Sequence, residues 1–274
     1  ACQTVNKAKA APVIDAERRL PAADMHAVLI NSGNANALTG PAGVEDVAVV
    51  TAAAAAALGI GGGVLMASTG VIGVKLPREK ILAALPRLAA GLQAAPELAA
   101  EAILTTDTRM KLASRTVRLG GKTCTLSAIA KGSGMVAPQL ATVVAVIATD
   151  ASITPPLLHE ALKAAMPDSF NNLTVDDDMS TNDAVFALAN GLAKNPTISE
   201  EGPDFAAFKK ALESVCIELA REVAADGEGA TKLLEVTVKH APTDEIAKDV
   251  AKSIAGSTLV KAAMFGCDPN WGRV

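Results

Sequence analysis

The hydroxyl-bearing residue with the most suggestive surroundings is Thr142. A turn-rich segment, 132–138, precedes it, and an apolar, β-branched run, 143–148, follows it. That run is short enough to be a buried strand. Thr142 is therefore predicted where a loop enters a core strand. The strand would fix the residue in position and leave its hydroxyl accessible. The pattern leaves an ordinary strand threonine as the alternative.

A catalytic role for Thr142 requires a base and an oxyanion site, because a threonine hydroxyl is a weak nucleophile at neutral pH. No His or Asp lies close to it in the sequence. Cleavage between Ala141 and Thr142 would supply the base, since the new α-amino group has a pKa of about 7.7–8.0. The small Ala141 and the Gly- and Pro-containing loop suit a strained scissile turn. The hydroxyl would attack the Ala141 carbonyl, and water would resolve the resulting ester.

Three further places offer groups that such a reaction needs. Thr69 and Gly70 follow a predicted strand in a tight turn, where a hydroxyl and an N–H can stabilise an oxyanion. Lys131 stands at the edge of the Gly-rich loop and could hold a substrate carboxylate. Glu228 lies between two glycines and could hold a substrate ammonium. The alternatives are an ordinary turn, a solvated lysine and a surface carboxylate.

A metal site is not expected. The cysteines and histidines are scattered without metal-ligand spacing. Asp176, Asp177 and Asp178 could bind a divalent cation, but the polar run that follows them favours a helix-capping loop. Cys124 and Cys216 are predicted to be buried free thiols, which suits a reducing, cytoplasmic location.

The composition favours tightly packed α/β layers. Half of the 274 residues are hydrophobic, yet the chain has one Trp, five Phe and no Tyr, so Ala, Val, Leu and Ile must build the core. The scarcity of aromatics and the net charge of −4 argue against nucleic-acid binding. Gly or charge interrupts each apolar stretch, so no membrane span is expected, and the start shows no signal-peptide pattern.

Hydrophobic periodicity and turn residues predict alternating strands and helices. The expected strands are 28–30, 64–67, 115–119, 122–126, 143–148, 170–175 and 233–240. The expected helices are 45–58, 77–93, 98–103, 154–165, 205–225, 244–254 and one from the polar loop 176–183 through residue 192. Glycines 120 and 121 predict a β-hairpin. The mixture predicts a layered α/β protein.

The motifs resemble the ornithine acetyltransferases of arginine biosynthesis, also called glutamate N-acetyltransferases. The run KGSGMVAPQLAT before a β-branched strand carries the resemblance, together with NSGNANALTG, STGVIG, AILTTDT, TVDDDMSTND, DGEGATKLLEV and GCDPNWGR. They occur in the family's order and span essentially the whole chain. The resemblance implies a fold of layered mixed sheets and helices, of the ornithine acetyltransferase and N-terminal-nucleophile aminopeptidase type.

The resemblance also implies self-processing. The chain is expected to cut itself between Ala141 and Thr142 into an α chain, 1–141, and a β chain, 142–274, which associate as an α2β2 heterotetramer. Thr142 would take the acetyl group from N2-acetylornithine, and glutamate would then collect it in ping-pong order. The substrates are small amino acids, with no nucleic acid or membrane as partner.

The site residues follow from the matched motifs. By resemblance, Thr69 and Gly70 form the oxyanion hole, and the substrate contacts are Thr105, Lys131, Thr142 and Glu228. Neither a cofactor nor a metal is implied. Some family members also use acetyl-CoA as a co-substrate donor, a choice that the sequence leaves open.

Two departures from the family stand out. Asp177 occupies a position where members often have Gly. Family members also continue beyond GCDPNWGR with a segment that supplies an Asn and a Ser or Thr to the site, so the chain is expected to lack that segment. The alternatives are therefore a related self-processing aminopeptidase, acting as a hydrolase, and a truncated inactive copy or binding module.

Overall fold

A computed structural model describes residues 1–137 and 143–274. Its strands are β1 (Cys2–Gln3), β2 (Ala27–Asn34), β3 (Val64–Val71), β4 (Lys111–Leu119), β5 (Lys122–Lys131), β6 (Val144–Thr149) and β7 (Ala184–Ala189). Its helices are α1 (Ala11–Arg19), α2 (Gly40–Leu58), α3 (Arg78–Ala90), α4 (Pro96–Ala102), α5 (Pro155–Ala165), α6 (Pro203–Ala225), α7 (Asp244–Gly256) and α8 (Thr258–Phe265). Two single 3-10 turns, Phe170–Asn172 and Trp271–Arg273, complete the described elements.

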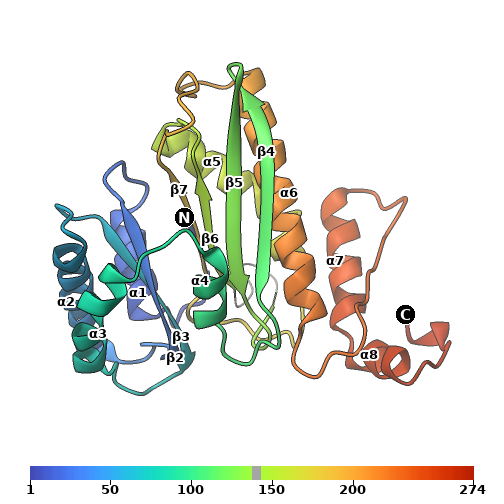
Figure 1. The fold of residues 1–274 in the computed structure, drawn as a ribbon. Coiled ribbons are helices and arrows are strands. Elements are labelled where there is room, and N and C mark those ends of the chain that lie inside the picture. Colours follow the sequence, from blue (N-terminus) through green and yellow to red (C-terminus); the bar gives the residue numbers. More distant parts are fainter. Residues whose placement is uncertain (138–142) are drawn as a thin grey trace.

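The larger sheet has five strands in the order β1-β7-β6-β5-β4 (Figure 1). β6 and β7 run parallel, and the other neighbours run antiparallel. β4 and β5 form the predicted hairpin around Gly120 and Gly121, which confirms that turn. The smaller sheet pairs β2 with β3 in parallel.

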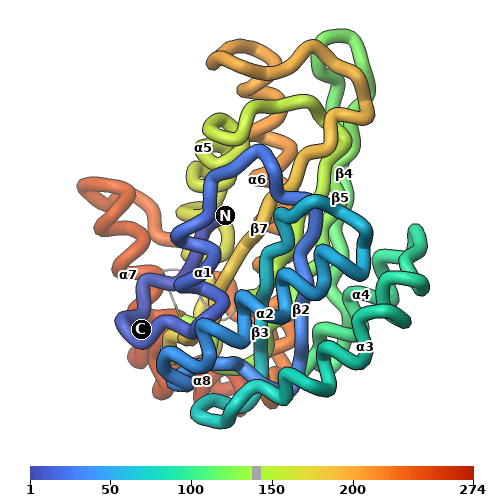
Figure 2. The backbone as a smooth tube through the Cα atoms, turned by 90° about the vertical axis from the view of Figure 1, so that its left-hand side faces the viewer, coloured from blue at the N-terminus to red at the C-terminus, as the bar shows by residue number. Residues whose placement is uncertain are grey.

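The elements stack in four layers. α5 and α6 cover one face of the five-stranded sheet, and the β2–β3 sheet packs on the other face, where Leu65 and Ala67 meet Val144 and Phe186. α2 and α3 lie over the outer face of β2 and β3 (Figure 2). The predicted layered α/β fold is therefore confirmed.

The middle strands are apolar throughout because both of their faces are covered. On β6, Ala145 and Ile147 point into the core under α5 and α6, whereas Val144 points toward β3. β7 alternates in the same way, with Val185 on the helix side and Phe186 on the β3 side. Side chains of successive strand residues point to opposite faces, so each face of these strands joins a different core.

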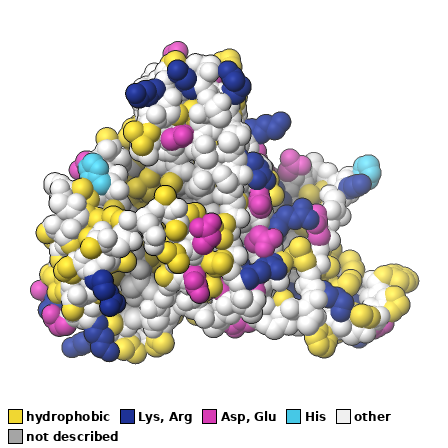
Figure 3. Space-filling model, viewed as in Figure 1, with side chains coloured by type: hydrophobic (Ala, Val, Ile, Leu, Met, Phe, Trp, Pro, Cys, Tyr) yellow, Lys and Arg dark blue, Asp and Glu magenta, His cyan; other side chains and the backbone are white. Residues whose placement is uncertain are grey.

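The face that carries α6 is held by surface ion pairs as well as by apolar packing. Arg115 lies 2.5 Å from Glu218 and Arg109 lies 3.0 Å from Glu222. Side chains of both signs are interspersed there, whereas hydrophobic side chains gather near α8 and the C-terminus (Figure 3). Trp271, near the end of the chain, is exposed. Exposed pairs of this kind contribute little to stability, so the buried apolar face of α6 is the main contact.

Helix α2 is long and apolar enough to span a membrane by length and composition alone. In the structure Val47 and Val50 pack against Met66 of β3, and Ala54 packs in a core with Leu85 of α3. The core helix of a soluble protein meets the same criterion, so the composition of α2 is weak evidence for a membrane span.

Two expected elements near the site are wrong. Ser68 to Gly70 do not form a turn after β3, because their pairing with β2 continues through Ser32–Thr69 and Gly33–Gly70. The segment expected as a helix to residue 192 is strand β7, since its apolar residues fit between two cores as a parallel neighbour of β6. The preceding polar loop therefore caps no helix.

Two expected strands are also wrong. Residues 170–175 begin with a 3-10 turn whose Phe170 fills the core. Residues 233–240 are described but form no strand. They lie between α6 and α7, where no described strand offers them backbone partners, and strand patterning alone does not make a ladder. The other predicted strands and helices are present, with boundaries that shift by a few residues.

Candidate active site

Lys131 is the buried cation of the candidate site. It is the last residue of β5 and its side chain is 3% exposed. Its Nζ donates to Thr105 Oγ1 at 2.6 Å and to Thr69 Oγ1 at 3.3 Å, and lies 3.5 Å from Asp107 Oδ2. Burial lowers the pKa of Lys131, and Asp107 opposes this by favouring the charged form. The structure thus brings together three of the residues predicted from the sequence: Thr69, Thr105 and Lys131.

Thr69 and Gly70 lie side by side near the end of β3. Thr69 is buried, and Gly70 is exposed with a φ of 129°. A Cβ at Gly70 would lie 2.3 Å from the carbonyl carbon of Gly33 on β2, so the close approach of these strands requires glycine. Since Lys131 can only donate, Thr69 Oγ1 accepts from it and keeps its own hydrogen for another acceptor.

Thr105 and Asp107 belong to the connection between α4 and β4. The Asp107 side chain is fully buried, and its Oδ1 accepts from Lys111 Nζ at 2.8 Å and from the Gly132 amide at 2.7 Å. Its Oδ2 accepts from the Thr105 amide at 3.2 Å. Burial by itself would raise the pKa of Asp107, but the two lysines and the Gly132 amide outweigh it and lower the pKa.

Glu228 is exposed and lies against the Gly-rich loop. Its amide donates to the carbonyl of Ser133 at 2.9 Å. A Cβ at Gly134 would lie 2.5 Å from the Glu228 carboxylate, so the loop must be glycine here for the carboxylate to pack against it. The structure records no contact between Glu228 and Lys131, which are linked through the loop.

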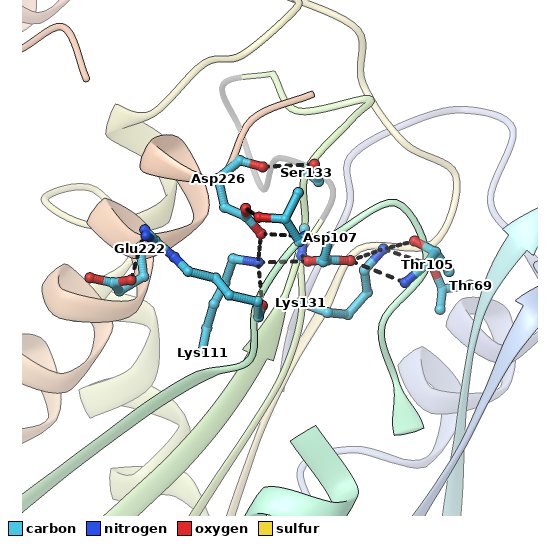
Figure 4. A network of polar contacts seen from close by, with 11 residues as sticks. Thr69, Thr105, Asp107, Lys111, Lys131, Ser133, Glu222 and Asp226 are labelled. Atoms are coloured by element: carbon cyan, nitrogen blue, oxygen red, sulfur yellow. Dashed lines mark hydrogen bonds and ion pairs between the residues drawn. The ribbon is translucent and has the colours of Figure 1, made fainter. Parts of the chain in front are cut away.

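A buried ion network connects Asp107 with Asp226 (Figure 4). Lys111 is 1% exposed and lies between Asp107 and Asp226, with Nζ 2.6 Å from Asp226 Oδ2. Asp226 accepts from both the amide and the hydroxyl of Thr108, and its carbonyl accepts from Ser133 Oγ at 2.7 Å. Burial alone would raise the pKa of Asp226, but Lys111 and Thr108 lower it.

A third buried carboxylate immediately precedes β7 and contacts the backbone just before β6. Asp183 is 1% exposed, and its Oδ1 accepts from the Val143 amide at 3.1 Å. Its Oδ2 has no hydrogen-bond partner among the described residues. Burial raises the pKa of Asp183 well above its ordinary value, and the Val143 amide and the charge of Lys131 offset this only in part.

The predicted nucleophile Thr142 and the predicted cleavage site Ala141–Thr142 lie outside the described residues. The described chain resumes at Val143, and Val144 pairs in register with Lys131. Thus the residue that follows Thr142 is held by Asp183, and the next one lies beside Lys131.

Sequence reasoning missed the polar residues that hold the site together. Asp107 and Lys111 are four positions apart, but Asp226 lies 115 positions beyond Lys111, and the residue types alone predict surface positions. Asn182 and Asp183 were interpreted as helix caps. Instead Asn182 Nδ2 donates to the carbonyls of Ala35 at 2.6 Å and Ser68 at 2.9 Å, which joins β7 to the β2–β3 sheet. The sequence signal that could have indicated these residues was the density of hydroxyl and acidic side chains at 105–108 and 180–183.

The acidic run at 176–178 serves the backbone. Asp176 accepts from the amides of Met135 and Val136, the latter at 2.8 Å, and thereby fixes the end of the Gly-rich loop. Asp177 is exposed with a φ of 66°, a left-handed conformation that glycine adopts more readily than aspartate. Within residues 1–137 and 143–274, no group of three or more His, Cys, Asp or Glu side chains could hold a metal ion.

Comparisons with known proteins agree with these features. The ArgJ family model matches residues 1–274. The arginine biosynthesis bifunctional protein ArgJ of Symbiobacterium thermophilum is 50% identical over 275 residues, which cover 99% of this chain and 68% of that protein. The protein of the same name from Geobacter sulfurreducens is 48% identical over 276 residues, which cover 100% of this chain and 70% of that protein.

Solved structures of the same kind also match. Ornithine acetyltransferase from Mycobacterium tuberculosis, complexed with ornithine, matches 52% of this chain and 75% of its own, with 34% identity and a TM-score of 0.44. ArgJ from Bacillus halodurans matches 53% of this chain and 75% of its own, with 33% identity and a TM-score of 0.46.

The class follows first from the whole-chain match: the protein is an enzyme of a biosynthetic acyltransferase type, not a binding module. The chain belongs to the ArgJ family. The resemblance to the ornithine acetyltransferase family, seen first in the motifs, is thereby confirmed.

Proposed function

We propose that this protein transfers the acetyl group of N2-acetylornithine to glutamate, giving ornithine and N-acetylglutamate. Its family and the names of its relatives support this reaction. The observation that carries the proposal is the buried ammonium of Lys131. It is bonded to Thr69 and Thr105 and lies in register with Val144, two residues beyond the proposed nucleophile Thr142.

The first half-reaction loads Thr142. Its hydroxyl oxygen attacks the acetyl carbonyl carbon, and the amide C–N bond of N2-acetylornithine breaks. The hydroxyl proton passes through the free α-amino group of Thr142, the base created by self-cleavage, to the departing amine of ornithine. Thr69 Oγ1 and the Gly70 amide donate to the developing oxyanion. Because Thr69 already accepts from Lys131, its own hydrogen is left for this purpose.

The second half-reaction unloads Thr142. The amine of glutamate attacks the acetyl carbonyl carbon, and the ester bond to the Thr142 oxygen breaks. The α-amino group of Thr142 takes the proton that the glutamate amine loses and passes it to the leaving Thr142 oxygen. Donor and acceptor are both amino acids with a carboxylate, so a single site can take them in turn. Lys131 and the Thr105 hydroxyl would receive the carboxylate, and Glu228, which lies against the Gly-rich loop, would receive a cationic group.

The two fragments produced by cleavage, 1–141 and 142–274, would stay together. β4 and β5 come from the first fragment, β6 and β7 from the second, and β1 of the first pairs with β7 of the second. Separation would therefore break two ladders of one sheet. We extend the proposal to an α2β2 assembly in the cytoplasm and to acetyl-CoA as an alternative acetyl donor.

Intact mass spectrometry tests the reaction. The purified protein is incubated with N2-acetylornithine, and each fragment is weighed before and after glutamate is added. We expect one acetyl group on the fragment that begins at Thr142, and its removal when glutamate is added. Thr142→Ala is the control, in which neither cleavage nor the adduct should occur.

Other outcomes separate the alternatives. An adduct that water discharges at the same rate without glutamate would indicate a hydrolase of the aminopeptidase type. A single uncut chain without an adduct would contradict both enzymatic mechanisms. Normal cleavage in Thr142→Ala would show that another residue is the nucleophile.

A further inference from the structure

Lys111 contacts none of the residues to which a substrate role has been assigned, yet three of them depend on its partners. Asp107, on one side of Lys111, accepts from the Thr105 amide and lies 3.5 Å from Lys131 Nζ. Asp226, on the other side, precedes Glu228 by two residues. Figure 4 shows Lys111 between the two carboxylates, with Lys131 beyond Asp107.

The geometry around Lys111 uses its whole hydrogen-bonding capacity. Its Nζ lies 2.8 Å from Asp107 Oδ1, 2.6 Å from Asp226 Oδ2 and 3.3 Å from the carbonyl of Arg109. A lysine ammonium has three donors, so no hydrogen is left over. The side chain has no exposed surface. Lys111 is therefore fixed in position and cannot itself reach a ligand in the open part of the site.

The charges of the network balance. Two aspartates, Asp107 and Asp226, face two lysines, Lys111 and Lys131, so the formal charge is zero. Lys111 takes the shorter contact to Asp107, whereas Lys131 lies farther away and makes its shortest bond to a neutral hydroxyl, Thr105. Without Lys111, Lys131 would be the single cation of the network beside two carboxylates. Its ammonium would then be attracted to these carboxylates and would be less available to a substrate.

The same contacts fix the Gly-rich loop. Asp107 Oδ1 accepts from the Gly132 amide, and the Asp226 carbonyl accepts from Ser133 Oγ. The carbonyl of Ser133 in turn accepts from the Glu228 amide. The first two residues of the loop, Gly132 and Ser133, are thus attached to aspartates that Lys111 holds in place.

We propose that Lys111 is a positioning residue for substrate recognition. It neutralises Asp107 and Asp226, so that the charge of Lys131 is kept for the carboxylate of an amino-acid substrate, and it sets the spacing between Lys131 and Glu228. This inference rests on the substrate roles given to Lys131 and Glu228 in the proposed function. A buried ion network is weak evidence for stability alone, which makes a role in the site the more specific explanation.

Isothermal titration calorimetry with glutamate tests the proposal on the full chain. Lys111→Met keeps the side-chain volume but removes the charge, and we expect it to weaken glutamate binding by about tenfold or more, because Lys131 is drawn to two uncompensated carboxylates. Asp226→Asn leaves the network one charge positive, and we expect binding at least as tight as in wild type. The double variant restores neutrality and should recover most of the loss.

A merely structural role makes a different prediction. If Lys111 and Asp226 only held the fold, the single variants would lower the folded fraction and leave glutamate binding per folded molecule unchanged. Unchanged binding in Lys111→Met, or a double variant that binds more weakly than either single variant, would overturn the proposal. Lys122→Met, at the exposed hairpin, is the matched control and should bind glutamate as wild type does. Thermal unfolding of each variant gives the folded fraction.

Failure of the proposed function is distinguishable from failure of this inference. Glutamate binding that follows the expected order of variants, in a wild-type protein that transfers no acetyl group, would contradict the reaction and support the role of Lys111. Normal transfer in wild type, with unchanged glutamate binding and an unchanged KM in Lys111→Met, would support the reaction and contradict the role of Lys111.

Discussion

Asp107 and Asp183 are two buried aspartates of the candidate site, and their pKa values shift in opposite directions. Asp107 has no exposed side-chain surface, and Asp183 is 1% exposed. The pKa of Asp107 is lowered despite its burial, because Lys131, Lys111 and the Gly132 amide favour the carboxylate. The pKa of Asp183 is raised well above its usual value, because burial dominates and its hydrogen bond comes from the neutral Val143 amide.

The difference shows that partners, not burial, decide the state of an acid in this site. Desolvation penalises the charged form of both residues, and at Asp107 the two lysines and the Gly132 amide together reverse its effect on the pKa. Asp107 is thus a carboxylate that pairs with the lysines. Asp183 accepts from the Val143 amide, and its environment favours the protonated acid. Acids with pKa values shifted in opposite directions are a common property of catalytic sites.

The largest effect is expected from removing the charge of Asp107. Asp107→Asn leaves Lys111 and Lys131 with Asp226 as the remaining carboxylate of the network. Breaking a buried ion pair from one side costs about 3–5 kcal/mol, because the other charge is left uncompensated. We expect the free energy of unfolding at neutral pH to fall by about 3 kcal/mol or more, measured by urea denaturation.

The control for that loss is Asp168→Asn. Asp168 pairs with Lys248 at 2.7 Å, but its side chain is 54% exposed. An exposed pair contributes about 0–1 kcal/mol, so the variant should unfold almost as wild type does. Equal losses in the free energy of unfolding of the two variants would show that the buried Asp107 network contributes no more to stability than an exposed ion pair.

Asp183→Asn should have a smaller effect with the opposite sign at neutral pH. A carboxyl whose folded-state pKa is raised contributes stability that is present below its unfolded pKa, about 3.9, and is lost as the pH rises toward the folded-state value. Asparagine resembles the protonated acid and still accepts from the Val143 amide. We therefore expect Asp183→Asn to match wild type near pH 4 and to become the more stable protein as the pH rises.

Urea denaturation at a series of pH values measures this difference. Asp107→Asn supplies the contrast, because a lowered folded-state pKa contributes stability that is present above the unfolded pKa and is lost as the pH falls through the folded value. Its deficit relative to wild type should therefore shrink in acid. A deficit of Asp183→Asn that grows as the pH rises would mean that Asp183 is held as a carboxylate.

Much of the fold was predictable because its signals are local. The Gly120–Gly121 hairpin, the Pro-initiated helices α5 and α6, and the apolar run of β6 depend on a few neighbouring residues. Strand β7 was not predictable, because a short apolar segment fits a helix as well as a strand. Its position between two cores decides the matter, and that position depends on distant parts of the chain.

The candidate site likewise contains residues that could be predicted from the sequence and residues that could not. Thr69, Lys131 and Glu228 stand in sequence contexts that suggest chemistry, and the family resemblance gives them roles. The ion network could not be predicted, since Lys111 and Asp226 are 115 positions apart and each alone is typical of a solvated residue. Only the packing of α6 beside β4 brings them together. Likewise, the function of Asp183 depends on a β6–β7 pairing that was missed.

The smallest effect is expected at Asp177, an exposed aspartate in the loop that leads to Asp183. Its φ of 66° is left-handed, which costs a residue with a side chain about 1–2 kcal/mol, less for Asp than for most. Glycine removes that strain but increases the entropy of the unfolded chain. We expect Asp177→Gly to change the free energy of unfolding by about 0.5 kcal/mol or less, and to leave glutamate binding unchanged. A loss as large as that of Asp107→Asn would mean that the Asp177 carboxylate has a partner of its own, and the contrast between buried and exposed acids would no longer hold.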